Sequence, residues 1–186
     1  MRGRKYGVIY ADPAWSFRNK RTGGTMCSGA VAHYDVMSLE EICALPVAEI
    51  AAENCVLFMW WVGSQPEEAL AVVEAWGFEL KTMTGFTWVK KTKHWRDFFG
   101  MGFYTRQGCE NCLIAVRGRP KRVSASVRAV VKARVGVHSE KPQVFRDRIV
   151  ELMGDVPRVE LFARVPTPGW DVWGNEVESS ICLERM

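Results

Sequence analysis

The sequence predicts one α/β domain in which strands alternate with helices and a functional site lies at the carboxyl edge of the sheet. Two patterns carry this prediction: short apolar runs rich in β-branched and aromatic residues, and segments whose apolar residues recur at helical spacing. The 186 residues are 48% hydrophobic and 25% charged, which is typical of a packed globular protein. Because a chain of this length fits a single core, we expect one domain over residues 1–186.

The first half of the chain contains two expected strands and two expected helices. Residues 55–62 are continuously apolar, as in a central strand covered on both faces. Ser38 and Glu41 fit the capping box of a helix. A polar loop as long as residues 16–35 is usually functional in a compact domain. In chain order, we expect a strand over 6–11, this loop, a helix over 38–45, a strand over 55–62 and a helix over 64–77.

The second half adds three expected strands and one helix. Residues 78–89 and 111–116 suit an antiparallel pair at a sheet edge, separated by a basic and aromatic loop over 90–108. Apolar residues recur at helical intervals over 142–153, and Gly154 follows them. Residues 158–163 alternate and predict the last strand, which is followed by a loop over 164–175 that contains proline and glycine.

The composition argues against a membrane protein, a secreted protein and a metal protein. The longest uncharged apolar stretch, around residues 54–64, falls short of the roughly 18–20 residues of a membrane-spanning helix. The N-terminus lacks the apolar segment of a secretory signal, so we expect a cytoplasmic protein with its six cysteines reduced. Cys109 and Cys112 are the one close pair. They have no second ligand pair at zinc-finger spacing, so we expect buried thiols and no metal.

Positive charge is concentrated in one part of the chain. The formal net charge is only +4, but residues 80–139 contain thirteen Lys or Arg against two acids, Asp97 and Glu110. Such a concentration indicates a surface that meets a polyphosphate, while the alternative is an ordinary solvated face. The run over 117–122 interrupts the strand pattern like a loop, so Lys121 and Arg122 are candidate contacts to a nucleic acid.

The tetrapeptide Asp12-Pro13-Ala14-Trp15 places a carboxylate, a stiffened backbone and a large aromatic directly after a buried strand. An adenine amino group is a poor nucleophile because its lone pair is delocalised into the ring. A carboxylate and a backbone carbonyl that accept its two hydrogens would favour the pyramidal, reactive form, and a tryptophan can stack on the base. Alone, the tetrapeptide is more typical of a structural turn with a core tryptophan.

The tetrapeptide belongs to a longer series of motifs that follow one another in a recognisable order. The sequence resembles the MT-A-seventy-like family of adenine methyltransferases, the relatives of the seventy-kilodalton catalytic subunit of the messenger-RNA adenosine methyltransferase. The resemblance covers almost the whole chain. Its pieces are residues 9–15, 33–41, 57–62, 76–78, 86–91, 110–118, 138–142, 160–164 and 169–176.

The resemblance implies S-adenosyl-L-methionine as cofactor and assigns roles to the matching residues. Asp12 would lie between methyl donor and target amine with the Pro13 carbonyl as second acceptor, and Trp15 and Tyr34 would form walls of the base pocket. The implied cofactor contacts are Asp12, Lys141 at the methionine carboxylate, Glu160 and Arg164 as a pair at the ribose, and Asn175 and Glu176 at the ribose or adenine. Without the family, Tyr34 is a loop aromatic, Lys141 precedes an ordinary helix, and Glu160 with Arg164 is a surface ion pair.

The family also implies a Rossmann-like methyltransferase fold that is circularly permuted, with the catalytic strand first and the main cofactor strand last. In such a fold, residues 161–164 replace a glycine-rich cofactor loop. The chain departs from the family at Ala14, where a second proline is usual. We expect activity to survive, because the Pro13 carbonyl is still available.

The resulting prediction is an enzyme that methylates the 6-amino group of adenine in a nucleic acid, with DNA preferred. RNA and single-stranded substrates are alternatives, since a base in a duplex must first be flipped out. The alternative from another class is a catalytically inactive subunit that presents nucleic acid to a partner. We expect a monomer or a dimer with a like subunit, and no membrane partner.

Overall fold

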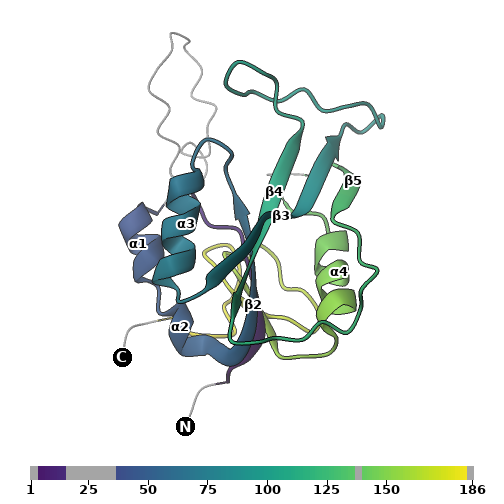
Figure 1. Cartoon of the computed structure of the whole chain (residues 1–186). Coiled ribbons are helices and arrows are strands. Elements are labelled where there is room, and N and C mark those ends of the chain that lie inside the picture. Colours follow the sequence, from purple (N-terminus) through teal and green to yellow (C-terminus); the bar gives the residue numbers. More distant parts are fainter. Residues whose placement is uncertain (1–3, 16–36, 137–139, 184–186) are drawn as a thin grey trace.

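A seven-stranded sheet forms the centre of the computed structural model, which describes residues 4–15, 37–136 and 140–183. The strand order is β5-β3-β4-β2-β1-β6-β7 (Figure 1). β4 is antiparallel to both of its neighbours, and the remaining pairs are parallel. The strands are β1 Tyr6–Ala11, β2 Ala51–Trp61, β3 Glu79–Lys91, β4 Cys109–Arg117, β5 Val130–Arg134, β6 Arg158–Leu161 and β7 Asp171–Trp173.

Helices cover both faces of the sheet. α1 and α3 lie together on one face and α4 lies on the other (Figure 1). The predicted capping box is confirmed, because Glu41 N–H donates to Ser38 Oγ at 3.1 Å and Ser38 N–H donates to Glu41 Oε2 at 2.7 Å. The helices are α1 Leu39–Ala44, α2 Val47–Ile50, α3 Pro66–Ala75 and α4 Val144–Met153. None of the helices among the described residues is long and apolar enough to cross a membrane.

β2 is the central strand that its apolar run predicts. Cys55, Leu57 and Met59 pack into the core on the α1 and α3 side, and the alternate residues of the strand pack into the core on the α4 side. Each of these side chains is at most 5% exposed. A strand buried on both faces has no polar positions to reveal its period of two, which explains why the run is continuously apolar.

The structure corrects the prediction at two strands and one sheet edge. β3 and β4 pair antiparallel as expected, but they do not form the edge, because β5 pairs with the outer side of β3. β5 exposes Lys132 and Arg134 on either side of Ala133, and charged residues are common on edge strands because they discourage aggregation. β7 has only three residues and lies inside the predicted loop 164–175.

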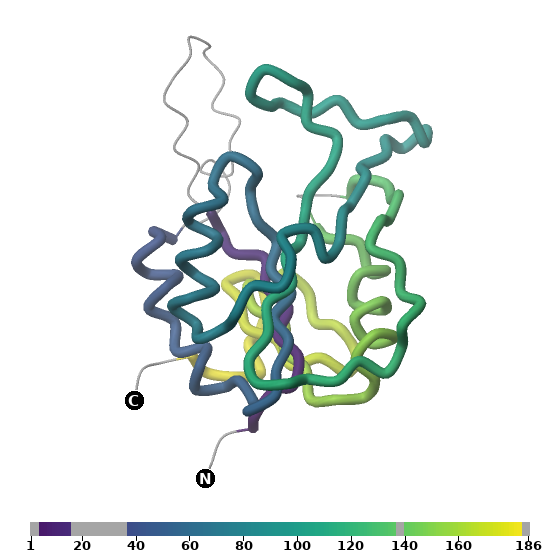
Figure 2. Tube along the Cα trace, viewed as in Figure 1, coloured from purple at the N-terminus to yellow at the C-terminus, as the bar shows by residue number. Residues whose placement is uncertain are grey.

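Two long connections leave the sheet at opposite edges. β1, β2, β3 and β6 share one direction, so their carboxyl ends meet at a single edge, and the loop over 92–108 leaves from that edge. β4 runs the other way, and its last residue, Arg117, pairs with Cys55 near the start of β2. The connection over 118–129 therefore runs along the opposite edge, as the Cα trace shows (Figure 2).

Candidate active site

Asp12 lies at the carboxyl edge of the sheet, directly after β1. Its backbone N–H donates to the Leu161 carbonyl at 3.4 Å, which ties it to the end of β6. Its carboxylate accepts a hydrogen bond from Lys141 Nζ at 2.7 Å, and 20% of the side chain is exposed. The first strand and the segment before α4 thus meet at one acidic group.

Lys141 connects Asp12 to a row of alternating charges. Its ammonium is 2.7 Å from Asp12 and 3.3 Å from Glu110 Oε2, and Glu110 also pairs with Lys90. The Lys141 side chain is 8% exposed and lies 5.3 Å from the centre of the Trp60 ring. A lysine this deeply buried needs both carboxylates, because an unpaired charge in the interior is costly.

The pKa shifts of Lys141 and Glu110 favour the charged form of both side chains. Burial opposes the charge on Lys141, but the Asp12 and Glu110 carboxylates outweigh it and raise the pKa of the ammonium above its usual value. Burial likewise opposes the charge on Glu110, but Lys141 and Lys90 outweigh it and hold the pKa of the carboxyl below its usual value. Each charge is therefore maintained by its neighbours in the row.

The turn after Asp12 holds Trp15 mostly inside the core. Trp15 N–H donates to the Pro13 carbonyl at 2.8 Å, and its indole Nε1–H donates to the Trp60 carbonyl at 3.1 Å. The side chain is only 7% exposed. The structural reading of this tryptophan is therefore correct for most of its ring, and the Pro13 carbonyl keeps one lone pair for another donor.

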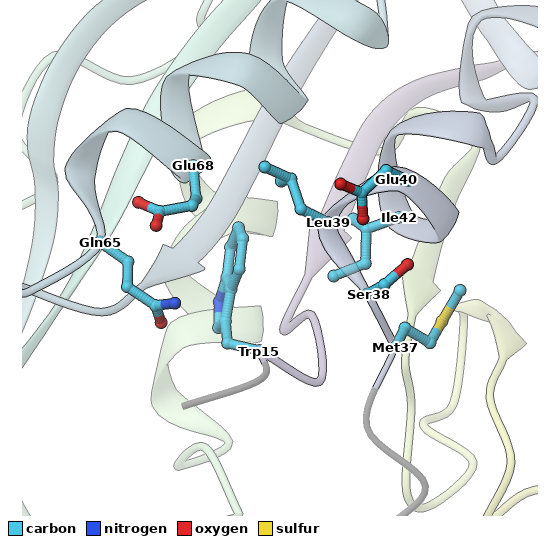
Figure 3. Close-up of a pocket in the computed structure, with 8 residues that line it drawn as sticks. All are labelled: Trp15, Met37, Ser38, Leu39, Glu40, Ile42, Gln65 and Glu68. Carbon is cyan, nitrogen blue, oxygen red and sulfur yellow. The ribbon is translucent and has the colours of Figure 1, made fainter. Parts of the chain in front are cut away.

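The part of Trp15 that is not packed lines a pocket of about 200 Å³ between α1 and the start of α3. In Figure 3 the indole stands between Gln65 and Glu68 on one side and Leu39 and Ile42 on the other. Trp15 lines this pocket, whereas Asp12 lines a different one.

A second pocket brings most of the predicted cofactor residues together. It is lined from the ends of β1 and β6 and from the segment around the start of α4. Four residues that the sequence assigned to the cofactor line this pocket together: Asp12, Lys141, Glu160 and Arg164. The rest of the lining is Glu140, Arg146, Phe162 and Val165.

Glu160 pairs with Arg146, whereas the sequence suggested Arg164. Arg146 Nε and Nη2 donate to the two Glu160 oxygens at 2.7 and 2.6 Å, and both side chains are at most 6% exposed. Arg146 Nη1 also donates to the Lys141 carbonyl at 3.1 Å. Arg164 instead lies 3.8 Å from Glu176. The alternative of a surface ion pair between Glu160 and Arg164 is therefore wrong, because α4 places Arg146 against the carboxylate, while the assignment of both residues to the ribose stays a prediction.

The turn that ends β6 is built by an unusual backbone. Phe162 adopts a φ of 62°, a left-handed conformation that side chains rarely take and that stops the strand before the predicted residue 163. The turn is held by Ala163 N–H, which donates to the Trp173 carbonyl at 2.9 Å. A side chain on Gly174 would collide with the Ala163 backbone, so this glycine permits the close approach of the two segments.

The structure does not bring every predicted residue to this edge. Asn175 and Glu176 do lie at this edge, because they follow β7, which is parallel to β6, and Glu176 Oε1 is 3.8 Å from Arg164 Nε, but neither residue lines the second pocket. Lys121 and Arg122 are exposed on the connection over 118–129, at the opposite edge of the sheet from Asp12. Tyr34 lies outside the described residues.

Sequence reasoning gave no role to three charged residues of this site: Lys90, Glu110 and Arg146. Glu110 had a signal, because it is one of only two acids in the basic stretch 80–139, and both of these acids pair with lysines. Arg146 had one too, because it shares a helix face with Ile149 and Met153, which are both buried. A charge on an apolar face predicts a buried partner.

The expectation of two buried thiols is confirmed for Cys112 and wrong for Cys109. Cys109 is exposed and Cys112 is buried, as expected for residues three apart that face opposite sides. Burial raises the pKa of the Cys112 thiol well above its usual value, so this thiol stays protonated. Among the described residues, no group of three or more His, Cys, Asp or Glu side chains is placed to hold a metal ion.

The chain is similar to known proteins over nearly all of its length. A family model described as MT-A70 matches residues 6–176. The chain is 34% identical to the type II methyltransferase M.MunI of Mycoplasma sp, over 94% of this chain and 78% of that protein. It is 25% identical to the human N(6)-adenosine-methyltransferase catalytic subunit METTL3, over 97% of this chain but 30% of that protein.

A further relative is the N(6)-adenosine-methyltransferase MT-A70-like protein of Drosophila melanogaster, which is 27% identical over 94% of this chain and 27% of its own length. This chain thus spans less than a third of the two named adenosine methyltransferases. The matched range includes every residue that lines either pocket, and the match confirms the resemblance inferred from the motifs. The chain belongs to the MT-A70 family.

Proposed function

We propose that the protein transfers a methyl group from S-adenosyl-L-methionine to the 6-amino group of adenine in a nucleic acid. The observation that carries the proposal is the placement of Asp12, which follows β1 at the edge where β6 ends and faces a pocket with Lys141, Glu160 and Arg164. The family match and the names of its methyltransferase relatives support the reaction type.

The residues around the second pocket suit the chemical groups of S-adenosyl-L-methionine. Lys141 is a cation that can pair with the carboxylate of its methionine part, Glu140 and Glu160 can accept hydrogen bonds from ribose hydroxyls, and Arg164 can donate hydrogen bonds to the ribose. We assign Asn175 and Glu176, on the segment after β7, to the ribose or adenine. When bound, the cofactor supplies an electrophilic methyl carbon attached to a positively charged sulfur.

The chain's own residues can activate the amine. The Asp12 carboxylate accepts a hydrogen bond from one N–H of the amino group, and the second lone pair of the Pro13 carbonyl accepts a hydrogen bond from the other N–H. These two hydrogen bonds turn the nitrogen lone pair away from the ring and toward the second pocket. Lys141 stabilises the charge of Asp12 before substrate arrives. We assign the exposed part of Trp15, together with Tyr34, to the walls around the base.

We also infer that the fold is circularly permuted relative to the usual methyltransferase order. β1 and β6 are neighbours in the sheet although they come first and sixth in the chain. Their ends carry Asp12 and Glu160, the proposed catalytic and cofactor acids. A catalytic strand that comes first and a cofactor strand that follows it is the arrangement that the family resemblance implies.

DNA is the substrate that we propose. The similarity to the type II methyltransferase M.MunI extends over 78% of that protein, whereas the adenosine methyltransferases contain long regions that this chain does not match. A methylation assay with radiolabelled cofactor on duplex DNA, single-stranded DNA and RNA of the same sequence tests this. Transfer to adenine in either form of DNA supports the proposal, and transfer to RNA alone contradicts the choice of DNA.

Cofactor binding distinguishes an enzyme from a catalytically inactive subunit that only binds nucleic acid. Calorimetry should show that S-adenosyl-L-methionine binds the protein and that Lys141→Ala weakens this binding. A protein that binds nucleic acid but neither binds the cofactor nor transfers methyl groups would instead be a presenting subunit.

A further inference from the structure

The loop over 92–108, between β3 and β4, exposes a group of large apolar side chains. We call it the aromatic loop. Tyr104 is fully exposed, and Phe99 is 76% exposed. Exposed apolar residues that gather in one segment mark a site of interaction, because scattered single residues are the norm elsewhere on a soluble protein. The members of the group are Trp95, Phe99, Met101, Phe103 and Tyr104.

This exposure is built into the backbone of the loop. Gly100 and Gln107 exchange two hydrogen bonds, at 2.8 and 3.3 Å, and a side chain on Gly100 would collide with the Gln107 carbonyl. Trp95 and Tyr104 have φ values of 62° and 60°, which non-glycine residues rarely adopt. Such backbone conformations cost free energy, and the exposed rings do not offset this cost by packing in the core. Strained backbone of this kind is typical of binding sites.

Positive charge surrounds these rings. The Arg106 guanidinium lies 5.0 Å from the centre of the Phe99 ring, and that of Arg134 lies 5.8 Å from the Trp95 ring. The one acid of the loop, Asp97, is already paired with Lys91. Five exposed cations form no ion pair with any residue of the described ranges: Lys93, Arg96 and Arg106 on the loop, and Lys132 and Arg134 on β5.

The aromatic loop is continuous with the candidate active site. Lys90 precedes it and Glu110 follows it, and these two residues pair with each other. Glu110 also pairs with Lys141, which holds Asp12. The loop leaves the sheet at the edge where β1 ends, above β5 in the view of Figure 1. A polyanion bound to the aromatic loop would therefore lie next to the charged residues that lead to Asp12.

We propose that the aromatic loop and the adjacent edge of β5 bind an unpaired stretch of nucleic acid. This inference rests on the proposed function and specifies the form of its substrate. Bases stack on the exposed rings, and phosphates contact the five cations. The rings select unpaired strands because a base inside a duplex already has both faces stacked, whereas cations alone would bind either form.

Fluorescence anisotropy without cofactor tests the proposal. The probes are a labelled DNA strand of about 20 nucleotides, longer than usual single-strand sites, and the same strand annealed to its complement. The wild-type protein should bind the single strand more tightly. Phe99→Ala and Phe103→Ala should each weaken single-strand binding about tenfold and leave duplex binding nearly unchanged, while Phe99→Tyr should retain it.

Matched controls lie at the opposite edge of the sheet. Val123 is 70% exposed there, close to the value for Phe99, and Lys81 is an exposed cation near the start of β3. Val123→Ala and Lys81→Ala should leave single-strand affinity unchanged, whereas Arg106→Ala should lower it and reduce its dependence on salt. Equal loss in the two sets of variants would overturn the proposal.

Two further outcomes are decisive. If Phe99→Ala changes the sedimentation coefficient but not the affinity for the single strand, the aromatic loop is an interface between copies of the chain and the proposal is wrong. If binding depends on the loop but no methyl transfer occurs on any substrate, the proposed function fails while the binding surface stands. If the protein transfers methyl groups but its affinity for the single strand does not change in Phe99→Ala or Phe103→Ala, the proposed role of the aromatic loop is wrong and the proposed function stands.

Discussion

Lys141 Nζ lies 2.7 Å from the Asp12 carboxylate, so the proposed catalytic acid is paired with a buried cation across 129 residues of sequence. The same ammonium is 3.3 Å from Glu110. This lysine joins three segments of the chain: the end of β1, the start of β4 and the residues before α4. Its charge therefore matters to the fold as well as to the cofactor that we propose.

Removal of the Lys141 charge should destabilise the protein. Lys141→Met leaves Asp12 without its cation and Glu110 with Lys90 alone, and the loss of one partner of a buried pair costs about 3–5 kcal/mol. Because Asp12 and Glu110 are partly exposed, we expect a loss of at most about 3 kcal/mol in the free energy of unfolding, measured with urea. Lys121→Met, on the opposite edge, is the control and should change stability by less than about 0.5 kcal/mol.

The contribution of Glu110 to stability should depend on pH with a definite sign. Its pKa is lowered in the folded state from an ordinary value of 4.5, so its contribution is present above that value and is lost as the pH falls through the folded pKa. The pKa of Lys141 is raised from 10.5, so its contribution is present below that value and is lost as the pH rises through the folded pKa.

Unfolding of the wild type and of Glu110→Gln across a pH series checks these directions. The difference in free energy of unfolding should be constant between about pH 5 and pH 9 and should shrink on acidification below the usual range of glutamate. A difference that grows as the pH falls would show that the Glu110 carboxyl is not stabilised by its two lysines.

Removal of one partner of the buried pair of Arg146 and Glu160 should lower the free energy of unfolding strongly, whereas replacement of both partners by apolar residues should lower it much less. Arg146→Met leaves the Glu160 carboxylate buried without a partner and should cost about 3–5 kcal/mol, whereas the double variant with Glu160→Leu should recover most of that loss. Urea unfolding of the four proteins of this cycle measures the coupling. The double variant should nevertheless fail to bind S-adenosyl-L-methionine in calorimetry, because the carboxylate assigned to the ribose is gone.

Trp15 should prove mainly structural. Trp15→Phe keeps an aromatic ring but removes the indole donor to the Trp60 carbonyl, which leaves that buried acceptor without this bond and costs about 1–3 kcal/mol. We expect this loss in thermal or urea unfolding, with a smaller effect on the affinity for nucleic acid. A variant of unchanged stability but much weaker substrate binding would instead make base contact the main role of the ring.

Local patterns in the sequence predict those parts of the fold that local physics decides. The capping box of Ser38 and Glu41 is made by residues three apart, and the unbroken apolar run of β2 itself indicates burial on both faces; both predictions are confirmed. β5 escaped prediction because Lys132 and Arg134 look like solvated loop, although an edge strand accommodates them equally well. β7 is too short to show a period.

The site divides in the same way. Asp12, Lys141, Glu160 and Arg164 carry motifs and were predicted to share one site, and they line one pocket. Their partners were not predictable from spacing, because Glu110 reaches Lys141 only through the antiparallel pairing of β4, and Arg146 reaches Glu160 only through the packing of α4. Basic charge alone also does not choose between the two edges of the sheet, because exposed cations lie at both: Lys121 and Arg122 at one edge, and Lys93 and Arg96 on the aromatic loop at the other.

The direct test of the account is the yield of N6-methyladenine from wild-type protein and from Asp12→Asn, measured by mass spectrometry of digested DNA under saturating S-adenosyl-L-methionine. Asparagine keeps the size of the side chain but removes the charge that accepts the amino hydrogen. We predict that turnover falls by roughly 10²–10⁴-fold, while Glu151→Gln, an exposed acid on α4, remains active. Near-native turnover by Asp12→Asn would contradict the assignment of Asp12 as the group that activates the amine.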